Sequence, residues 1–213
     1  HELLVLLIFL AMIAGTLAFI TITGEVREGD VQHIDELILS TFRHPDDLSK
    51  PRGPVWLTRA MRDITALGGV TVIFSLTIVV LGFLLLQRHY RTMILIGATS
   101  LGGFILVMVL KFLIARNRPN IVPPLMIENT PSFPSGHSMM SAVVYLSLAA
   151  LLARIQPTIP LRIYIILIAL LLTFLIGISR IYLGVHYPTD VLSGWSVGLA
   201  WASFCWFVAF YLE

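Results

Sequence analysis

Long apolar segments constrain this sequence more than any other feature. A helix that crosses the roughly 30 Å hydrocarbon core of a bilayer needs about 20 mostly apolar residues. Six segments of about this length follow one another along the chain, at residues 3–22, 66–86, 92–110, 138–153, 161–178 and 191–212. The fourth is the shortest. We therefore predict an all-α, polytopic membrane protein with six transmembrane helices, folded as a single domain over residues 1–213.

The composition supports a lipid environment. Of the 213 residues, 57% are hydrophobic and 12% are charged, whereas a water-soluble domain is about 45–50% apolar and about 25% charged. A globule of this composition would expose large apolar patches to water. The same composition excludes a disordered chain. The single Cys205 excludes a disulfide framework and a cysteine-based zinc site, and a net charge of +2 does not suit a nucleic-acid surface.

The first apolar segment is longer than the core of a typical signal peptide, and no small-x-small cleavage site precedes Thr23. We expect this segment to remain in the protein as the first span. Because the chain begins at His1 rather than Met, we also expect an N-terminal flank to be missing from the sequence.

The charges of the connecting segments predict the orientation. Six alternating spans place the connections after the second and fourth spans on one face, together with both termini. These connections are short and carry only basic charge, from Arg88, Arg91, Arg154 and Arg162. The positive-inside rule assigns this face to the cytoplasm. The opposite, outer face carries the long polar connection at residues 23–65, in which acidic residues slightly outnumber basic ones.

Within that outer connection, Ile34, Leu37, Ile38 and Phe42 recur at helical spacing, and prolines and a glycine interrupt the segment that follows. The pattern predicts a short amphipathic helix that lies on the bilayer surface. We expect this helix to have a packing role rather than a catalytic one.

Three polar clusters stand at span boundaries on the outer face, at residues 111–119, 134–137 and 179–190. Each has an ordinary explanation when taken alone, because cations at helix ends extend to the interface and a Pro-Ser-Gly turn caps a helix. Together, however, the clusters bring two histidines, an aspartate and several long cations to one face of a chain that is poor in charge. The cations there, which include Arg116, stand where the positive-inside rule disfavours them.

The cations suit a phosphate group, because Arg offers paired donors to phosphate oxygens and Lys adds a point charge. Lys111 and Arg118 are seven residues apart, so we expect them to share one helix face, with Pro119 ending or bending that helix. Ser135 and Gly136 precede a helix N-terminus, where free backbone N–H groups favour an anion.

The third cluster contains a possible histidine–carboxylate pair. Pro188 suits the first turn of the last span, which places His186 just before the helix and Asp190 inside its first turn. An aspartate that accepts a hydrogen bond from one ring N–H leaves the other imidazole nitrogen nucleophilic. Taken alone, Asp190 is better explained as an acid that interacts with the helix dipole.

These clusters resemble the three signature motifs of the type-2 phosphatidic acid phosphatase superfamily. They are Lys-x6-Arg-Pro at residues 111–119, Pro-Ser-Gly-His at 134–137 and Ser-Arg-x5-His-x3-Asp at 179–190. Order, spacing and every key residue match. The resemblance covers about residues 60–200, since the run at 62–69 is also similar to bacterial membrane members. The alternative explanation of that run is that Asp63 caps the second span.

The resemblance implies that His186 is the nucleophile and forms a phosphohistidine, that Asp190 is its partner, and that His137 acts first as the acid and then as the base. It also implies which residues hold the phosphoryl oxygens, namely Lys111, Arg118, Arg180, Ser135 and Gly136. Family members need no metal, so we expect no cofactor, and beyond Asp190 the outer loop beside the site offers only Glu128. We expect Arg116 to contribute little.

The implied function is dephosphorylation of a lipid phosphate or pyrophosphate at the periplasmic face of a bacterial inner membrane. Relatives act on phosphatidylglycerol phosphate, undecaprenyl pyrophosphate, phosphatidic acid, diacylglycerol pyrophosphate or lipid A, and the sequence does not choose among these lipids. The expected partners are the lipid substrate and membrane lipids, without nucleic acid, and the oligomeric state stays open. Two alternatives remain: a lipid phosphotransferase that uses the same intermediate, and a non-catalytic binder or transporter of anionic lipid.

Overall fold

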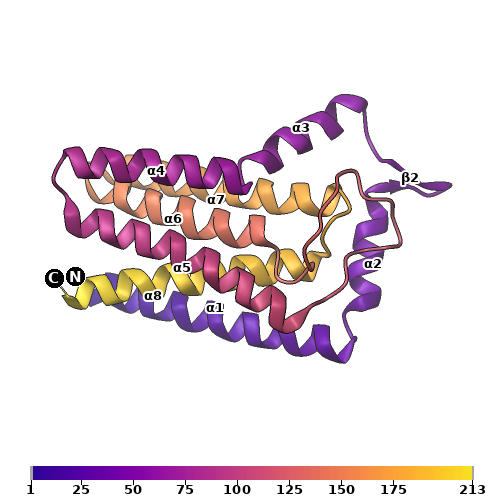
Figure 1. Cartoon of the computed structure of the whole chain (residues 1–213), viewed down its shortest axis with the longest axis horizontal. Helices are drawn as coiled ribbons and strands as arrows, with labels where there is room; N and C mark the ends of the chain where they lie inside the picture. Colours follow the sequence, from indigo (N-terminus) through magenta and orange to yellow (C-terminus); the bar gives the residue numbers. More distant parts are fainter. Residues whose placement is uncertain (1, 213) are drawn as a thin grey trace.

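Six long helices lie side by side in the computed structural model, which describes residues 2–212 (Figure 1). They are α1 (Glu2–Glu28), α4 (Val70–Leu86), α5 (Tyr90–Ile114), α6 (Gly136–Arg154), α7 (Ile159–Tyr182) and α8 (Pro188–Leu212). At one end of this bundle lie α2 (Gln32–Thr41), α3 (Val55–Ala66) and a small antiparallel hairpin of β1 (Arg43–His44) and β2 (Asp47–Pro51). Within the described range, five helices are long and apolar enough to cross a membrane, and the bent α3–α4 pair makes a sixth candidate. The prediction of an all-α polytopic membrane protein is confirmed.

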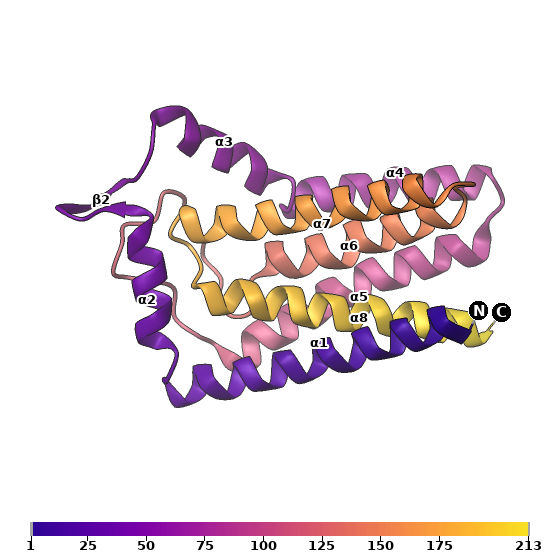
Figure 2. The ribbon, with the colours of Figure 1, turned by 180° about the vertical axis from the view of Figure 1, so that it is seen from behind.

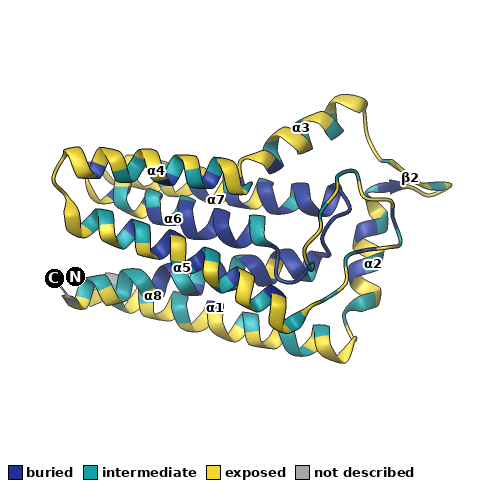
Figure 3. Cartoon of the chain, in the orientation of Figure 1, coloured by how far each residue is buried: buried dark blue, intermediate teal, exposed yellow. Residues whose placement is uncertain are grey.

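The outer faces of the bundle are exposed and apolar. Figure 3 shows exposed residues along α1, α4 and α5, and most of the residues in these helices are hydrophobic. Such a surface suits lipid rather than water. In contrast, 56% of the apolar span of α6 is buried, against 6% of that of α1. The core is therefore built around α6.

The connections alternate between the two ends of the bundle, as the sequence predicts. The start of α1, the end of α8 and the α4–α5 and α6–α7 connections lie at one end (Figures 1 and 2). At the other end lie α2, α3, the loop at residues 115–135 and the loop at residues 183–187. We call this second end the polar end. It contains all three of the clusters identified in the sequence.

The second span differs from the prediction at its start. A helix was expected from residue 66, but α3 ends at Ala66, and α4 begins at Val70 after a bend of 44°. Asp63 lies inside α3 and therefore does not cap α4, whose N-cap residue is Gly69. A Cβ atom on Gly68 would lie 2.5 Å from Ile176 Cγ2. The absence of a side chain at Gly68 thus lets the bend approach the other helices closely.

The predicted amphipathic helix is confirmed as α2, which lies across the polar end of the bundle (Figure 1). Its apolar residues Ile34, Leu37 and Ile38 are exposed, whereas Asp35 and Leu39 face inward and are buried. The hairpin that follows was not predicted, because the prolines in this segment indicated only an interruption. The burial of Asp35 shows that α2 also packs against the bundle through a polar side chain.

Candidate active site

Lys111 lies in the last turn of α5, where its side chain is buried and its Nζ donates a hydrogen bond to the backbone oxygen of Pro131. The helix ends at Ile114 because Ala115 adopts a left-handed conformation (φ 49°), and the Ala115 N–H donates to the Lys111 oxygen. This is a common way to end a helix. The prediction that Lys111 and Arg118 share one helix face is therefore wrong.

Arg118 reaches the same place from the loop that follows α5. Its Nε donates to the Thr130 oxygen at 2.8 Å and its Nη1 to the Val185 oxygen at 2.6 Å. The same Nη1 lies 3.4 Å from His186 Nε2. Burial lowers the pKa of Arg118 from its ordinary value. The backbone carbonyls thus fix the guanidinium beside Nε2 of the imidazole.

The second motif forms the start of α6. The hydroxyl of Ser135 is buried and accepts hydrogen bonds from Ser138 N at 3.4 Å and from Ser138 Oγ at 3.0 Å. Ser135 is therefore an N-cap residue, and it is not among the residues that line the pocket described below; the phosphate contact predicted for it stays a prediction. Gly136 and His137, in contrast, line a pocket. The backbone N–H groups of the first turn of α6 point toward the helix start, where they favour an anion.

The loop between α7 and α8 carries the third motif and turns sharply at Gly184. The backbone of Gly184 is in the left-handed region (φ 72°), which favours glycine. A Cβ atom here would lie 2.6 Å from Nη2 of the buried Arg43, whose Nη1 donates to the Tyr182 oxygen at 2.8 Å. Glycine therefore allows the loop to pack against the segment that follows α2.

Pro188 begins α8, as the sequence predicts, so His186 precedes the helix and Asp190 lies in its first turn. Asp190 Oδ2 lies 3.4 Å from His186 Nδ1 and accepts a hydrogen bond from Tyr187 N at 2.9 Å. Both the imidazole and the carboxylate are buried. The predicted approach of Asp190 to His186 is thus present in the structure.

The surroundings of His186 favour its neutral form. Burial lowers the pKa of His186 well below its ordinary value, and the charges of Arg180, Arg118 and Lys111 lower it further. A neutral imidazole with its Nδ1–H directed at the Asp190 carboxylate leaves an unprotonated Nε2. This nitrogen is the one beside Arg118.

Arg180 enters from the last turn of α7 and is fully buried. Its Nη1 donates to Thr65 Oγ1 at 3.0 Å, and its Nη2 forms an ion pair with Glu128. The Glu128 carboxylate also lies 3.8 Å from Arg118 Nη2. Among the described residues that line the pocket, Glu128 is the one carboxylate opposite three cations. Two positive charges therefore remain for a ligand, which suits a doubly negative phosphate.

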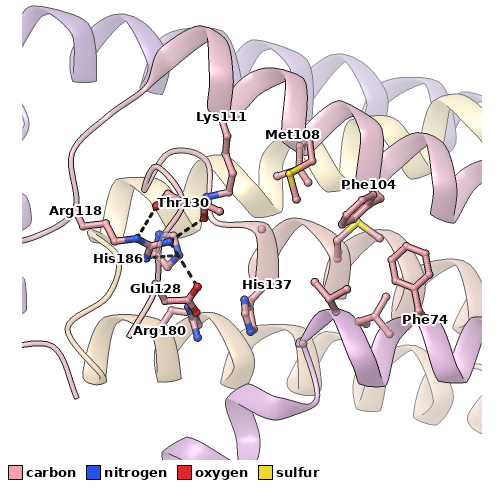
Figure 4. Close-up of a pocket in the computed structure, with 16 residues that line it drawn as sticks. Phe74, Phe104, Met108, Lys111, Arg118, Glu128, Thr130, His137, Arg180 and His186 are labelled. Carbon is pink, nitrogen blue, oxygen red and sulfur yellow. Dashed lines mark hydrogen bonds and ion pairs between the residues drawn. The ribbon is translucent and has the colours of Figure 1, made fainter. Parts of the chain in front are cut away.

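These groups surround one pocket of about 140 Å³. Figure 4 shows the charged side chains at one end of the pocket and Phe74, Phe104 and Met108 at the other. The charged end of the pocket is lined by Lys111, Arg118, Glu128, Thr130, Gly136, His137, Arg180 and His186. The apolar end is lined by Val70, Ile73, Phe74, Phe104, Val107, Met108 and Met140. The apolar end lies between α4, α5 and α6, so the pocket extends from the polar end into the membrane-spanning part of the bundle.

Two residues behind His186 were missed by the sequence analysis. Arg116 Nη1 donates to Asp190 Oδ1 at 2.7 Å, and Arg116 Nη2 pairs with Asp35 Oδ2 at 2.8 Å. Arg116, which we expected to contribute little, thus contacts the carboxylate that faces His186. Its position on a face where basic charge is disfavoured was a usable signal. Asp35, on α2, offered no comparable signal, because its partners are far away in the sequence.

Comparison with known proteins identifies the family. The model of the PAP2 superfamily, whose motifs the three clusters resemble, matches residues 91–213. The chain is 35% identical over 187 residues to phosphatidylglycerophosphatase B of Bacillus subtilis, which covers 86% of this chain and 87% of the relative. It is 33% identical over 156 residues to an undecaprenyl-diphosphatase of Sulfolobus acidocaldarius, which covers 66% of this chain and 69% of the relative.

Solved structures agree with this assignment. The crystal structure of the transmembrane PAP2 type phosphatidylglycerolphosphate phosphatase from Bacillus subtilis matches with a TM-score of 0.82 and 31% identity, over 95% of this chain and 97% of that chain. The crystal structure of Aquifex aeolicus LpxE matches with a TM-score of 0.59 and 28% identity, over 84% and 94% of the two chains. The sequence, the fold and the three motifs at one end of the bundle lead to the same conclusion: this chain belongs to the PAP2 superfamily.

Proposed function

We propose that this membrane protein hydrolyses a lipid phosphate or lipid pyrophosphate through a phosphohistidine at His186. The observation that carries the proposal is a pocket that joins a cationic end to an apolar end between spans α4, α5 and α6. A lipid phosphate has the same distribution of charge, with its phosphate at one end and its hydrocarbon chains at the other. The substrate can therefore react without leaving the membrane.

In the proposed first step, Lys111, Arg118 and Arg180 hold the phosphoryl oxygens. His186 Nε2 attacks phosphorus, and the bond from phosphorus to the leaving oxygen breaks, which is the ester oxygen of a lipid phosphate or the bridging oxygen of a lipid pyrophosphate. Asp190 stabilises the imidazolium that forms. His137, which lines the same pocket, donates a proton to the leaving oxygen.

In the second step, His137 accepts a proton from a water molecule that attacks the phosphohistidine. The nitrogen–phosphorus bond breaks, inorganic phosphate leaves, and His186 returns to its neutral form. The fixed cations stabilise the charge of the transition state in both steps, because they are already oriented before the reaction begins. The proposal involves no metal, and we expect activity to survive EDTA.

The names of the relatives indicate which lipids to test first. Phosphatidylglycerophosphatase B and undecaprenyl-diphosphatase suggest phosphatidylglycerol phosphate and undecaprenyl pyrophosphate as candidate substrates. The decisive assay measures phosphate release by the purified protein from a panel of lipid phosphates, with His186→Ala as the control. Release by the wild type alone supports hydrolysis. Transfer of the phosphoryl group to an acceptor lipid would indicate a phosphotransferase, and binding without turnover would indicate a lipid binder.

We further propose that the polar end faces the periplasm of a bacterial inner membrane. Arg88, in the α4–α5 connection at the opposite end, and Arg91, in the first turn of α5, support this orientation. After replacement of Cys205, the variants S49C and Q87C place a thiol at an exposed position near each end. A membrane-impermeant maleimide added to spheroplasts should label S49C and not Q87C. The opposite pattern would reverse the orientation.

A further inference from the structure

A network of buried charge lies behind His186, on the side away from the pocket cations. Asp190 is fully buried, and its two oxygens have different partners. Oδ2 faces His186 and the Tyr187 N–H, whereas Oδ1 accepts a hydrogen bond from Arg116 Nη1 at 2.7 Å. The guanidinium thus fixes the rotation of the carboxylate that the imidazole needs.

Arg116 is in turn held by α2. Its Nη2 lies 2.8 Å from Asp35 Oδ2, and its Nη1 also donates to Thr189 Oγ1 at 2.8 Å. The guanidinium carbon stands 4.4 Å from the centre of the Tyr187 ring, a favourable cation–π distance. Each terminal nitrogen therefore contacts a different carboxylate, and the plane of the guanidinium is fixed.

Asp35 also binds the start of α8 directly. Its Oδ1 accepts a hydrogen bond from Thr189 N at 3.0 Å, and its Oδ2 accepts one from the Thr189 hydroxyl. Unpaired N–H groups at a helix start favour a carboxylate. Here that carboxylate is Asp35 of α2, which is only 1% exposed. It binds Thr189, the residue just before Asp190.

The charges in this network stabilise one another. Burial alone would lower the pKa of Arg116, but the charge of Asp190 and the hydrogen bonds to Asp35 and Asp190 outweigh burial and raise that pKa. The guanidinium therefore stays charged between two buried carboxylates. Removing it would leave both carboxylates without their cationic partner, which is strongly unfavourable in a buried site.

We infer that Arg116 and Asp35 are positioning residues, which hold Asp190 so that its Oδ2 stays beside His186 Nδ1. This makes α2 part of the catalytic apparatus as well as a surface helix. The inference rests on the proposed function, because it concerns the same reaction at His186. Neither residue lines the pocket, so both act through Asp190 rather than on the substrate.

The first test separates turnover from substrate binding in the full-length protein. Arg116→Ala should lower kcat by about 100-fold, as expected when a catalytic group is displaced by about 1 Å. The isosteric Asp35→Asn should lower it by roughly 10-fold, since the Thr189 contacts can remain. KM should change little, because the pocket cations are intact. Arg59→Ala and Asp63→Asn, at exposed positions on α3, are the matched controls and should behave like the wild type.

The second test asks whether Asp35 acts through Arg116. If it does, adding Asp35→Asn to Arg116→Ala should reduce kcat little further, because residues in one network are not additive. Arg116→Lys, which keeps the charge but not the paired donors, should recover part of the loss. Full additivity and no recovery would indicate two unrelated structural effects.

The third test is the pH dependence of kcat. A loss of folded protein would lower the rate at every pH but would not shift either limb of the profile along the pH axis. Asp190 faces Arg116 and His186, and His186 faces Lys111, Arg118, Arg180 and His137. Arg116→Gln removes the cation that stabilises the Asp190 carboxylate, so the acidic limb of kcat should move to higher pH by about one unit.

The outcomes are distinct from those that test the proposed function. A wild type that releases no phosphate would overturn both proposals. An active wild type and an inactive His186→Ala, together with unchanged kcat in Arg116→Ala and Asp35→Asn, would overturn this inference alone. A fall in rate with unmoved pH limbs would also contradict it, because that result describes fewer folded molecules.

Discussion

The two sides of His186 carry charge in different ways. On the pocket side, Lys111, Arg118 and Arg180 face one carboxylate, and Lys111 and Arg118 donate to backbone carbonyls. On the rear side, Arg116 stands between Asp35 and Asp190, in direct contact with both. The pocket side keeps an excess of positive charge that only a ligand can balance. On the rear side the one guanidinium is already paired with two carboxylates and has no charge left for a ligand. We therefore expect the pocket side to bind and the rear side to orient.

The largest effect should come from the residue between the two sides. His186→Ala removes the proposed nucleophile and should lower phosphate release by about 10⁴-fold or more, leaving what the cations alone can contribute. Lipid phosphate hydrolysis measures this loss, and an unchanged Tm in detergent would show that the protein still folds. Substantial turnover by the folded variant would place the nucleophile elsewhere.

His137→Ala should come next. Loss of a general acid typically lowers the rate by about 10²–10⁴-fold. The loss should be smaller with an aryl phosphate, because an aryl oxygen leaves without needing a proton. Comparing kcat for the two substrate types tests this. An equal loss with both substrates would limit His137 to anion binding at the start of α6.

Variants of the pocket cations should differ from variants of the rear side in their effect on substrate binding. Replacing Lys111, Arg118 or Arg180 with Ala should each raise the transition-state free energy by about 2–4 kcal/mol, or roughly 30- to 1,000-fold in kcat/KM. KM should rise as well, unlike in the rear-side variants. A similar loss in Arg59→Ala would mean that these effects report general charge rather than specific contacts.

Replacing Glu128 should strengthen phosphate binding slightly, whereas replacing a pocket cation should weaken it. Its carboxylate pairs with Arg180 and lies near Arg118, where a phosphate would bind. Glu128→Gln removes the competing anion, so inorganic phosphate should inhibit several-fold more strongly. The inhibition constant measures this change. Weaker inhibition would show that Glu128 assists phosphate binding rather than competing with it.

The smallest effect concerns stability. The pKa of His186 is lowered in the folded protein, whereas in an unfolded chain it is about 6.5. Below that pH the unfolded chain takes up a proton that the folded protein does not, so the free energy of unfolding should fall with falling pH. In detergent, the pH dependence of Tm should be shallower for His186→Asn than for the wild type. Equal slopes would show that His186 does not contribute.

The spans and the pocket side could be predicted because their signals are local. An apolar run of membrane length predicts a span wherever it occurs, and alternation of the spans brings the three motifs to one end. Other features depend on contacts between distant segments. The left-handed Ala115 separates Arg118 from the helix face of Lys111, and the Ser135 hydroxyl caps α6 instead of facing the pocket.

Asp35 shows most clearly what could not be predicted from the sequence. Its place on α2 looks like that of any acid on an amphipathic helix. Its partners Arg116 and Thr189 become neighbours only when α2 crosses the end of the bundle. No spacing within the sequence contains that information. The part that Asp35 plays in the rear side could therefore be recognised only from the three-dimensional structure.

The central claim is that His186 carries the phosphoryl group during the reaction, and trapping that intermediate tests it most directly. The wild type is mixed with a lipid labelled in its phosphate, quenched in base within the first turnovers and digested into peptides. The label should be stable in base, labile in acid and located on the peptide that contains His186, and His186→Ala should carry none. Label on a different residue, or label that persists in His186→Ala, would contradict the account.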